Sequence, residues 1–231
     1  AKDAKGAKDA KEAKGATVKR GDEPPKVADP KELEAGCDEN GLISFRFRGQ
    51  KWPDVIEWFS ENAGVDIDWR ELPSDYLNVE TPRLYTLDET RDLLNRHLLA
   101  RGFTLLTHPG GLSVAKVAEL NPASVPRISI GELATRQPHD FVKVSFKLQS
   151  AFAEVLVAEL QSIKSPNGKL LALRVTNRIE AMDAVGSLRG MNMIINEEEG
   201  YDATEESVHE FRLIHTKAEE VRSYLLQFLG Q

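Results

Sequence analysis

The stretch ISFRFRGQKWPDVIEWFSENAGVDIDW, residues 43–69, changes its hydrophobic period twice and thereby decides the fold. Apolar and polar residues alternate over 43–48, which is the period of a strand with one buried face. Residues 52–63 then place apolar side chains at helical spacing, with a proline in the first turn and a glycine directly after the last turn. Alternation returns over 65–70. This strand–helix–strand order predicts the start of a compact α+β domain.

The chain continues the same alternation of strands and helices up to about residue 120. A short extended piece lies around 77–82. The helix predicted over 86–102 opens with a capping box formed by Thr86 and Glu89. Residues 103–117 read as a hairpin whose turn holds one proline and two glycines. We therefore predict a first α+β domain over residues 41–120.

A second α+β domain is predicted over residues 139–199. It follows residues 121–138, which hold three prolines and no sustained period and are predicted to be a linker. Its predicted elements are a strand at 140–148, a helix at 150–165, strands at 170–175 and 178–183, and a helix at 184–196 that two glycines weaken. The predicted fold class is α+β: two small domains of mixed β-sheet with packed helices, plus an incomplete third β-α unit.

Both ends of the chain have a different composition from the two domains. Residues 1–40 begin with the low-complexity run AKDAKGAKDAKEAKGATVKR and add prolines and charges, which predicts a disordered Ala/Lys-rich spacer. A basic anchor for an anionic surface is the alternative, although acidic residues dilute it. Residues 200–231 are interpreted as an acidic linker followed by the start of a second repeat.

The closing stretch repeats the opening of the second domain at a shift of 65 positions. The paired residues are Phe146 and Phe211, Leu148 and Leu213, Ala153 and Ala218, Glu154 and Glu219, and Leu160 and Leu225. Equal register through a strand and a helix favours a tandem copy. Because one strand and one helix cannot bury their own apolar faces, we expect the rest of this third module to follow residue 231 in the parent chain.

The sequence contains no recognisable catalytic or metal-binding motif. None of the five histidines (His97, His108, His139, His209 and His215) stands at a metal-ligand spacing, and the single cysteine, Cys37, rules out an internal disulfide. The net charge of −7 argues against a nucleic-acid module, and GSLRG at 186–190 does not have the spacing of a K-homology GxxG loop. We expect no enzyme activity, no cofactor, no metal and no nucleic-acid partner.

The three tryptophans are the strongest candidates for a binding surface. Trp52 and Trp69 lie on the predicted core faces of a helix and a strand. Trp58 lies off the apolar stripe of its helix. It is therefore the candidate partner contact.

These patterns resemble the periplasmic N-terminal region of secretins, the ring-forming outer-membrane channels of type II and III secretion and type IV pili. Residues 43–69, followed by TLDETRDLLNRHLLARGFTLL at 86–106, are similar to the short N-terminal domain shared by secretins and TonB-dependent signalling receptors. The second domain resembles the secretin ring-building repeat, whose signature stands here as NRIEAMD between Asn177 and Asp183. Arg178 and Glu180 make this strand less apolar than is usual in the family.

The resemblance implies a function in protein secretion through protein–protein contacts. It implies that the first domain contacts cargo or inner-membrane components of a type II secretion system, and that the repeats pack subunit against subunit into an oligomeric ring. It also implies a periplasmic location, with attachment to the outer membrane through a part of the parent protein outside this chain. The alternative is a free-standing periplasmic signalling or docking adaptor without a pore.

Overall fold

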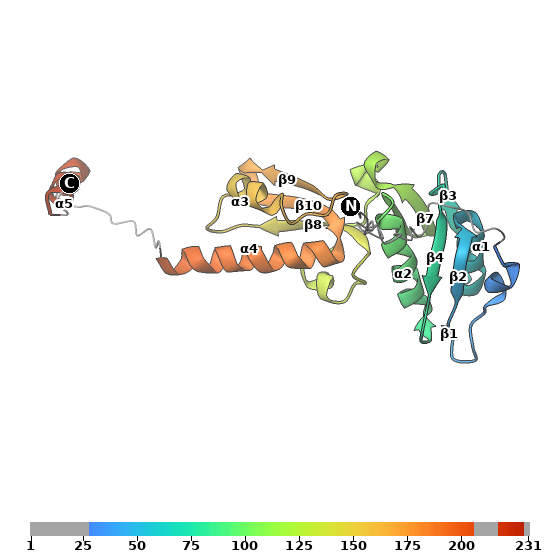
Figure 1. Ribbon diagram of the computed structural model, residues 1–231. Helices are drawn as coiled ribbons and strands as arrows, with labels where there is room; N and C mark the ends of the chain where they lie inside the picture. Colours follow the sequence, from blue (N-terminus) through green and yellow to red (C-terminus); the bar gives the residue numbers. More distant parts are fainter. Residues whose placement is uncertain (1–27, 206–216, 229–231) are drawn as a thin grey trace, which may run out of the picture.

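The computed structural model describes residues 28–205 and 217–228 of the 231-residue chain. Most of the predicted spacer and the strand predicted around Phe211 lie outside these residues. Figure 1 shows two α+β domains side by side, with a separate helix near the C-terminus. Among the described helices, none is long and apolar enough to cross a bilayer.

The first domain contains two helices and three small sheets. Its elements are η1 (Pro30–Glu34), β1 (Leu42–Ile43), β2 (Arg46–Lys51), α1 (Trp52–Ala63), β3 (Ile67–Trp69), β4 (Tyr76–Glu80), β5 (Tyr85–Thr86), α2 (Leu87–Leu99), β6 (Phe103–His108) and β7 (Gly111–Lys116). Strand β1 pairs with β5, β2 with β4, and β3 runs parallel to β7, which pairs with β6. The predicted order of elements is confirmed, except that the first predicted strand is split into β1 and β2 and that the short strand β5 before α2 was not predicted.

Local sequence signals set the ends of the two helices. Gly64 ends α1 in the left-handed conformation, at φ 61° and ψ 34°. Thr86 and Glu89 form the predicted capping box of α2. The buried faces of both helices meet the sheets in one apolar core, which includes Phe47, Trp52 and Leu94.

The prediction that Trp69 faces the core is wrong. Its side chain is 48% exposed. Strand β3 is only three residues long and lies at the edge of its sheet, where β7 is its one partner within the described part of the chain. An edge strand this short ends before the core can cover its last residue.

The second domain is a three-stranded antiparallel sheet with two helices on one face. Its elements are β8 (Phe141–Lys147), α3 (Ala153–Leu160), β9 (Lys169–Leu173), β10 (Arg178–Ala184) and α4 (Val185–Glu205), and the sheet order is β8-β10-β9. The separate C-terminal helix is α5 (Ala218–Phe228). Strand β10 therefore lies in the centre, with a partner on each side.

Helix α4 continues nine residues past its predicted end at 196, into the predicted acidic linker. Glutamate is a good helix former, so the acidic run does not stop the helix. The Glu199 carboxylate also accepts backbone N–H bonds from residues 149, 150 and 151, at 2.8, 3.2 and 3.0 Å. These bonds tie α4 to the loop before α3.

The segment predicted to be a linker packs against both domains. It contains the short turns η3 (Pro122–Ser124) and η4 (Gly131–Ala134). Its buried apolar residues are Val125, Ile128 and Leu133. Ile128 and Leu133 join the core of the second domain, whereas Val125 joins a cluster that also draws on the first domain. This segment has no hydrophobic periodicity, so contacts with residues distant in the sequence give it its ordered structure.

Candidate interaction surfaces

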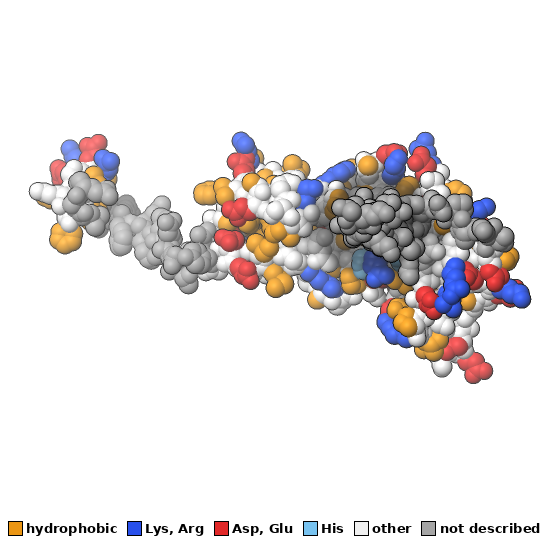
Figure 2. All heavy atoms as spheres, in the orientation of Figure 1, with side chains coloured by type: hydrophobic (Ala, Val, Ile, Leu, Met, Phe, Trp, Pro, Cys, Tyr) orange, Lys and Arg blue, Asp and Glu red, His pale blue; other side chains and the backbone are white. Residues whose placement is uncertain are grey.

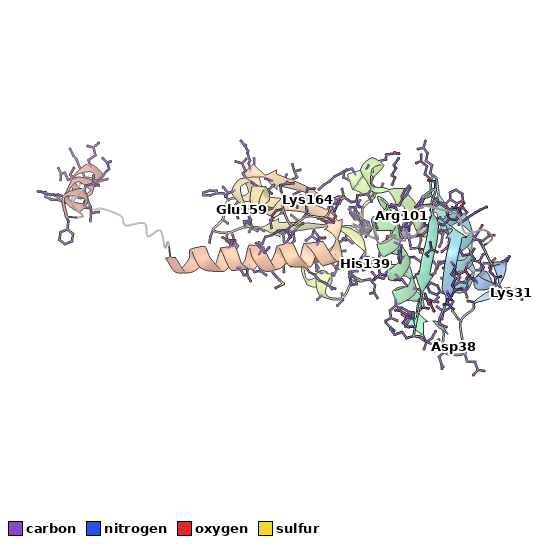
Figure 3. The ribbon with its side chains drawn as sticks, in the orientation of Figure 1. Lys31, Asp38, Arg101, His139, Glu159 and Lys164 are labelled. Carbon is purple, nitrogen blue, oxygen red and sulfur yellow. The ribbon has the colours of Figure 1, made fainter. Side chains whose placement is uncertain are left out.

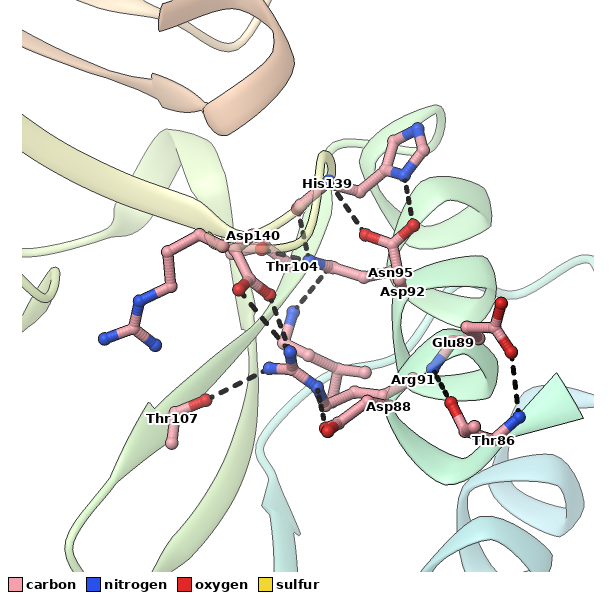
Figure 4. A network of polar contacts seen from close by, with 12 residues as sticks. Thr86, Asp88, Glu89, Arg91, Asp92, Asn95, Thr104, Thr107, His139 and Asp140 are labelled. Atoms are coloured by element: carbon pink, nitrogen blue, oxygen red, sulfur yellow. Dashed lines mark hydrogen bonds and ion pairs between the residues drawn. The ribbon is translucent and has the colours of Figure 1, made fainter. Parts of the chain in front are cut away.

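A polar network joins the two domains at the start of the second (Figure 4). The guanidinium of Arg91 on α2 lies 3.1 Å from the carboxylate of Asp140, and both side chains are largely buried. Next to this pair, Nδ1 of His139 lies 2.8 Å from Oδ2 of Asp92, and the His139 backbone N–H donates to Oδ1 of the same carboxylate at 2.8 Å. Figure 3 places His139 at the boundary between the domains.

The buried amide of Asn95 completes the network. Its Nδ2 donates to the His139 carbonyl at 2.5 Å, and its Oδ1 accepts from the Thr104 hydroxyl at 3.1 Å and the Leu105 N–H at 2.9 Å. One side chain thereby holds α2, β6 and the start of the second domain together. A buried amide with its partners supplied stabilises a single arrangement, because losing any partner leaves a buried polar group unpaired.

A small apolar core lies across the same junction. Its buried residues are Leu106, Val117, Leu120, Val125, Phe141 and Met182. They come from the first domain, the connecting segment and the second domain. Asn167 adds a further bond across the junction, from Nδ2 to the Leu99 carbonyl at 2.9 Å. This core and the polar network hold the two domains as one body.

The two residues of the predicted fold signature hold loops at opposite ends of β10. Asn177 adopts positive φ, 46°, directly before the strand. Its Nδ2 donates to the Ala151 carbonyl at 2.9 Å and its Oδ1 accepts from the Ala153 N–H at 3.0 Å, so it caps α3. Asparagine is one of the few residues that tolerate this backbone conformation.

At the other end, Asp183 is completely buried. Its carboxylate accepts from the Ser165 N–H at 2.8 Å, the Ser165 hydroxyl at 2.5 Å and the Ala184 N–H at 2.7 Å. Gly168 passes so close that a Cβ there would meet the Asp183 carboxylate. The geometry of both signature residues is that of loop anchors within the fold.

Trp58, the predicted partner contact, lies in the core of the first domain with only 3% of its surface exposed. Its ring packs with Phe45 and Phe47 at centroid distances of 4.8 and 4.9 Å, and its indole N–H donates to the Ala35 carbonyl at 2.7 Å. The segment around η1 covers the ring. A partner could therefore reach Trp58 only after this segment had moved away.

The η1 segment is fixed to β2 by one carboxylate. Oε2 of Glu32 accepts from the Arg48 backbone N–H at 2.8 Å and from Nε2 of Gln50 at 3.0 Å. Nε2 of Gln50 also donates to the Asp29 carbonyl at 2.8 Å. The spacing of apolar residues along α1 could not predict that Trp58 is covered, because the covering residues lie far away in the sequence.

The histidines that the structure describes lie in surroundings typical of structural residues. Burial lowers the pKa of His97 to about 4, with a further contribution from the nearby cations Arg96 and Arg101. His108 lies at the β6–β7 turn, where its Nδ1 accepts from the Gly110 N–H. His209 and His215 fall outside the described residues. Within the described part of the chain, no three His, Cys, Asp or Glu side chains gather as metal ligands would, and Cys37 is exposed.

Several exposed apolar side chains of the second domain lie at α3 and at the edge strand β9. They include Phe152 and Val155 at α3, Leu171 on β9 and Val175 shortly after it. Figure 2 shows hydrophobic side chains at the surface in the region where Figure 1 draws these elements. Among the described residues, β9 pairs only with β10, so its other edge is open there. Exposed apolar side chains at an open sheet edge are typical of a surface that contacts another protein.

No protein-family model matches the sequence, and no curated protein sequence matches it. Among solved structures, the chain superposes on part of a chain of the Klebsiella pneumoniae type II secretion system outer membrane complex, which holds PulD, PulS and the PulC HR domain. The TM-score is 0.60 at 16% identity, and the match covers 78% of this chain and 30% of that one.

Two further matches have lower TM-scores. One is the N-terminal domain of the secretin XcpQ from Pseudomonas aeruginosa, at 12% identity and TM-score 0.31, covering 82% of each chain. The other is the enterotoxigenic Escherichia coli GspC–GspD complex, at 11% identity and TM-score 0.29, covering 69% of this chain and 99% of that one. The resemblance seen in the sequence is confirmed at the level of the fold: the chain has the fold of the part of the Klebsiella type II secretion complex on which it superposes.

Proposed function

We propose that this chain is a periplasmic segment of a secretin-type outer-membrane channel, where it acts through protein–protein contacts and ring assembly. One observation carries the proposal: a TM-score of 0.60 to a type II secretion outer-membrane complex over 78% of the chain. A match of this extent includes more than either domain alone. Because fold alone does not establish function, the proposal also rests on the surfaces that this chain exposes.

The two domains have different roles in this proposal. The first domain contacts cargo or inner-membrane components of the secretion system, and the second packs against other copies of the same chain. The solved Klebsiella complex contains the PulC HR domain beside PulD and PulS. For this chain, the open edge of β9 and the apolar side chains around it supply a surface for such packing.

Catalysis has no part in the proposed function. The polar clusters of the described residues are used internally: the Asn95 amide and the Asp183 carboxylate each bind backbone N–H or C=O groups of this chain. Polar side chains that are bound to the backbone in this way stabilise the fold. Purified protein is accordingly expected to bind other proteins without turning over a substrate.

Fractionation of the native host separates this proposal from a free-standing adaptor. An antibody against residues 42–199 should detect the parent protein in the outer-membrane fraction, as a multimer that ordinary detergent extraction leaves intact. Deleting the region that encodes these residues should abolish secretion while the outer-membrane insertion of the parent protein persists. A soluble periplasmic monomer would favour the adaptor and overturn the channel proposal.

A further inference from the structure

The sequence contains two asparagine–glycine pairs, Asn40–Gly41 and Asn167–Gly168. Asparagine is thermolabile because its side-chain amide carbon can bond to the next backbone nitrogen and lose ammonia. A following glycine favours this reaction, since it has no Cβ to obstruct the approach. Both pairs are therefore candidate sites of spontaneous deamidation, and their surroundings in the fold decide which of them reacts.

The backbone hydrogen bonds at the two pairs are alike. The Gly41 N–H donates to the Asp38 carbonyl at 3.0 Å, and the Gly168 N–H donates to the Ser165 carbonyl at 2.9 Å. Each asparagine thus occupies the third position of a turn closed by the glycine that follows it. Because the attacking nitrogen is bound in the same way in both turns, a difference in reactivity must come from the side chains.

The side chain of Asn167 is held at the junction between the domains. Its Nδ2 donates to the Leu99 carbonyl at 2.9 Å, and the residue is half-buried. Gly168 is buried against the Asp183 carboxylate, which a Cβ at Gly168 would meet. Ring closure would turn the Asn167 amide towards Gly168 and break its bond to Leu99, which costs free energy. The folded junction therefore protects Asn167.

The side chain of Asn40 has no such restraint. Asn40 and Gly41 are both exposed, and the Asn40 amide makes no hydrogen bond within the part of the chain that the structure describes. A Cβ at Gly41 would meet no atom within 4 Å. Figure 3 places Asp38, at the start of this turn, at one end of the first domain. The Asn40 amide can therefore turn towards the Gly41 nitrogen, and water can reach the product.

We propose that Asn40 is a site of spontaneous deamidation to aspartate and isoaspartate, and that the fold protects Asn167 from the same reaction. The Gly41 nitrogen loses its proton to water and bonds to Cγ of Asn40, and the bond from Cγ to Nδ2 breaks as ammonia leaves. Water then opens the resulting succinimide. Addition at Cγ gives aspartate, and addition at the backbone carbonyl gives isoaspartate. Because the reaction needs only this chain and water, it does not depend on ring assembly.

The isoaspartate product should disturb the start of β1. Oδ1 of Asp38 accepts from the backbone N–H groups of Asn40 at 2.9 Å and Leu42 at 2.8 Å, and the Asp38 N–H donates to the Leu42 carbonyl at 2.8 Å. Isoaspartate inserts a methylene group into the backbone that these bonds span. The next residue, Ile43, is completely buried. The isoaspartate form should therefore be less stable, whereas the aspartate form keeps the backbone unchanged.

Peptide mapping tests the assignment, with Asn167 as the internal control. The purified chain is incubated at mildly alkaline pH, and deamidation is followed by mass spectrometry in the tryptic peptides 32–46 and 165–169, each of which contains one asparagine. Conversion at Asn40 should be at least tenfold faster than at Asn167. In urea the difference should fall below threefold. Asn40→Gln should abolish conversion in peptide 32–46 and leave peptide 165–169 unchanged, because glutamine closes its larger ring much more slowly.

A second measurement tests the structural effect. The isoaspartate form, separated by ion-exchange chromatography, should have a lower thermal midpoint than Asn40→Asp, which carries the same new charge without the backbone insertion. Equal midpoints of the two would overturn the effect on β1.

The mapping outcomes are equally distinct. Absence of conversion at Asn40 in the folded chain, or conversion at Asn167 that is as fast, overturns the assignment. A tenfold difference that persists in urea would show that the neighbouring sequence protects Asn167, and would overturn the protection by the fold. Fast conversion at Asn40 alone, with loss of the difference in urea, supports both parts of the proposal.

Discussion

Ser165 binds Asp183 twice: its N–H donates to Oδ2 at 2.8 Å and its hydroxyl donates to Oδ1 at 2.5 Å. Asp183 lies at the end of the central strand, and Ser165 lies in the loop that leads from α3 to β9. Gly168 of the same loop passes so close to the carboxylate that a Cβ there would meet it. The carboxylate thus replaces backbone pairing that the loop cannot make with the sheet.

Asp183→Ala is expected to lower the free energy of unfolding by about 1–3 kcal/mol, because it leaves the half-buried Ser165 N–H and hydroxyl without their acceptor. Urea denaturation followed by circular dichroism measures the loss. Asp68→Ala, at an exposed position of the first domain, is the matched control and should change stability by less than about 0.5 kcal/mol. Equal effects of the two substitutions would contradict the anchoring role of Asp183.

The junction between the domains should depend on Arg91. Arg91→Ala leaves the largely buried Asp140 carboxylate without its partner, and breaking such a pair costs about 3–5 kcal/mol. We expect the native chain to unfold in a single thermal transition and Arg91→Ala to unfold in two. Arg46→Ala is the control, since its pair with Glu80 is exposed and contributes at most about 1 kcal/mol. A single unshifted transition in Arg91→Ala would show that the shared core alone couples the domains.

The division into two domains with a connecting segment at 121–138 stays a prediction that limited proteolysis can test. The structure narrows the expected protease cleavage sites within this segment. Val125, Ile128 and Leu133 are buried, so the exposed stretches 121–124 and 129–132 should be cleaved first. Cleavage should also be faster in Arg91→Ala than in the native chain. No cut anywhere between 118 and 140 would contradict the division.

His97 should make stability depend on pH. Its pKa is lowered from 6.5 to about 4 in the folded chain, chiefly by burial. Between these two values the unfolded chain binds more protons, so stability is full above pH 6.5 and declines as the pH falls towards 4. His97→Gln should flatten this decline, measured by urea denaturation across the range. An equal decline between pH 6.5 and 4 in His97→Gln and in the native chain would contradict the role of His97.

The sequence predicted the elements well where the hydrophobic period is local. The capping box of α2, the β6–β7 hairpin and the strands of the second domain follow from spacing alone. The prediction from the sequence failed where contacts with distant residues decide whether a side chain is buried. Trp58 lies off its helical stripe yet is buried by the η1 segment, and Trp69 lies on its stripe yet is exposed at an edge strand.

The same limit applies to the candidate surfaces. Asn177 and Asp183 were found because a family pattern marks them, although spacing could not show that they anchor loops. The contacts of Asn95 with β6 and with the second domain leave no local signal, since its partners are up to 44 residues away. The strand register decides which charged side chains lie opposite each other. A shift of one residue in the pairing of β10 would move Arg178 to the other face of the sheet.

Helix α5 should be less protected than α3, its counterpart in the repeat. Leu160 is completely buried, whereas the matching Leu225 is 55% exposed. A short helix without tertiary packing is marginal in water. Hydrogen exchange is expected to be much faster at 218–228 than at 153–160. Equal protection in a monomer would show that other contacts already cover the apolar face of α5.

Trp58 gives the most direct test of the cover over the first domain. Glu32→Ala removes the carboxylate that holds the η1 segment to Arg48 and Gln50, and leaves the buried Gln50 amide with one partner fewer. We expect the segment to open more often, so that acrylamide quenches Trp58 more strongly and its emission shifts to longer wavelength.

The measurement needs a Trp69→Phe background, because Trp69 is exposed and would dominate the quenching. Glu34→Ala is the matched control: it removes an exposed carboxylate from the same turn, and that carboxylate makes no bond to β2. If Trp58 is a partner contact, a protein that binds the first domain should bind Glu32→Ala more tightly than Glu34→Ala. Weaker or equal binding would show that the partner recognises the covered surface, and would remove Trp58 from the contact.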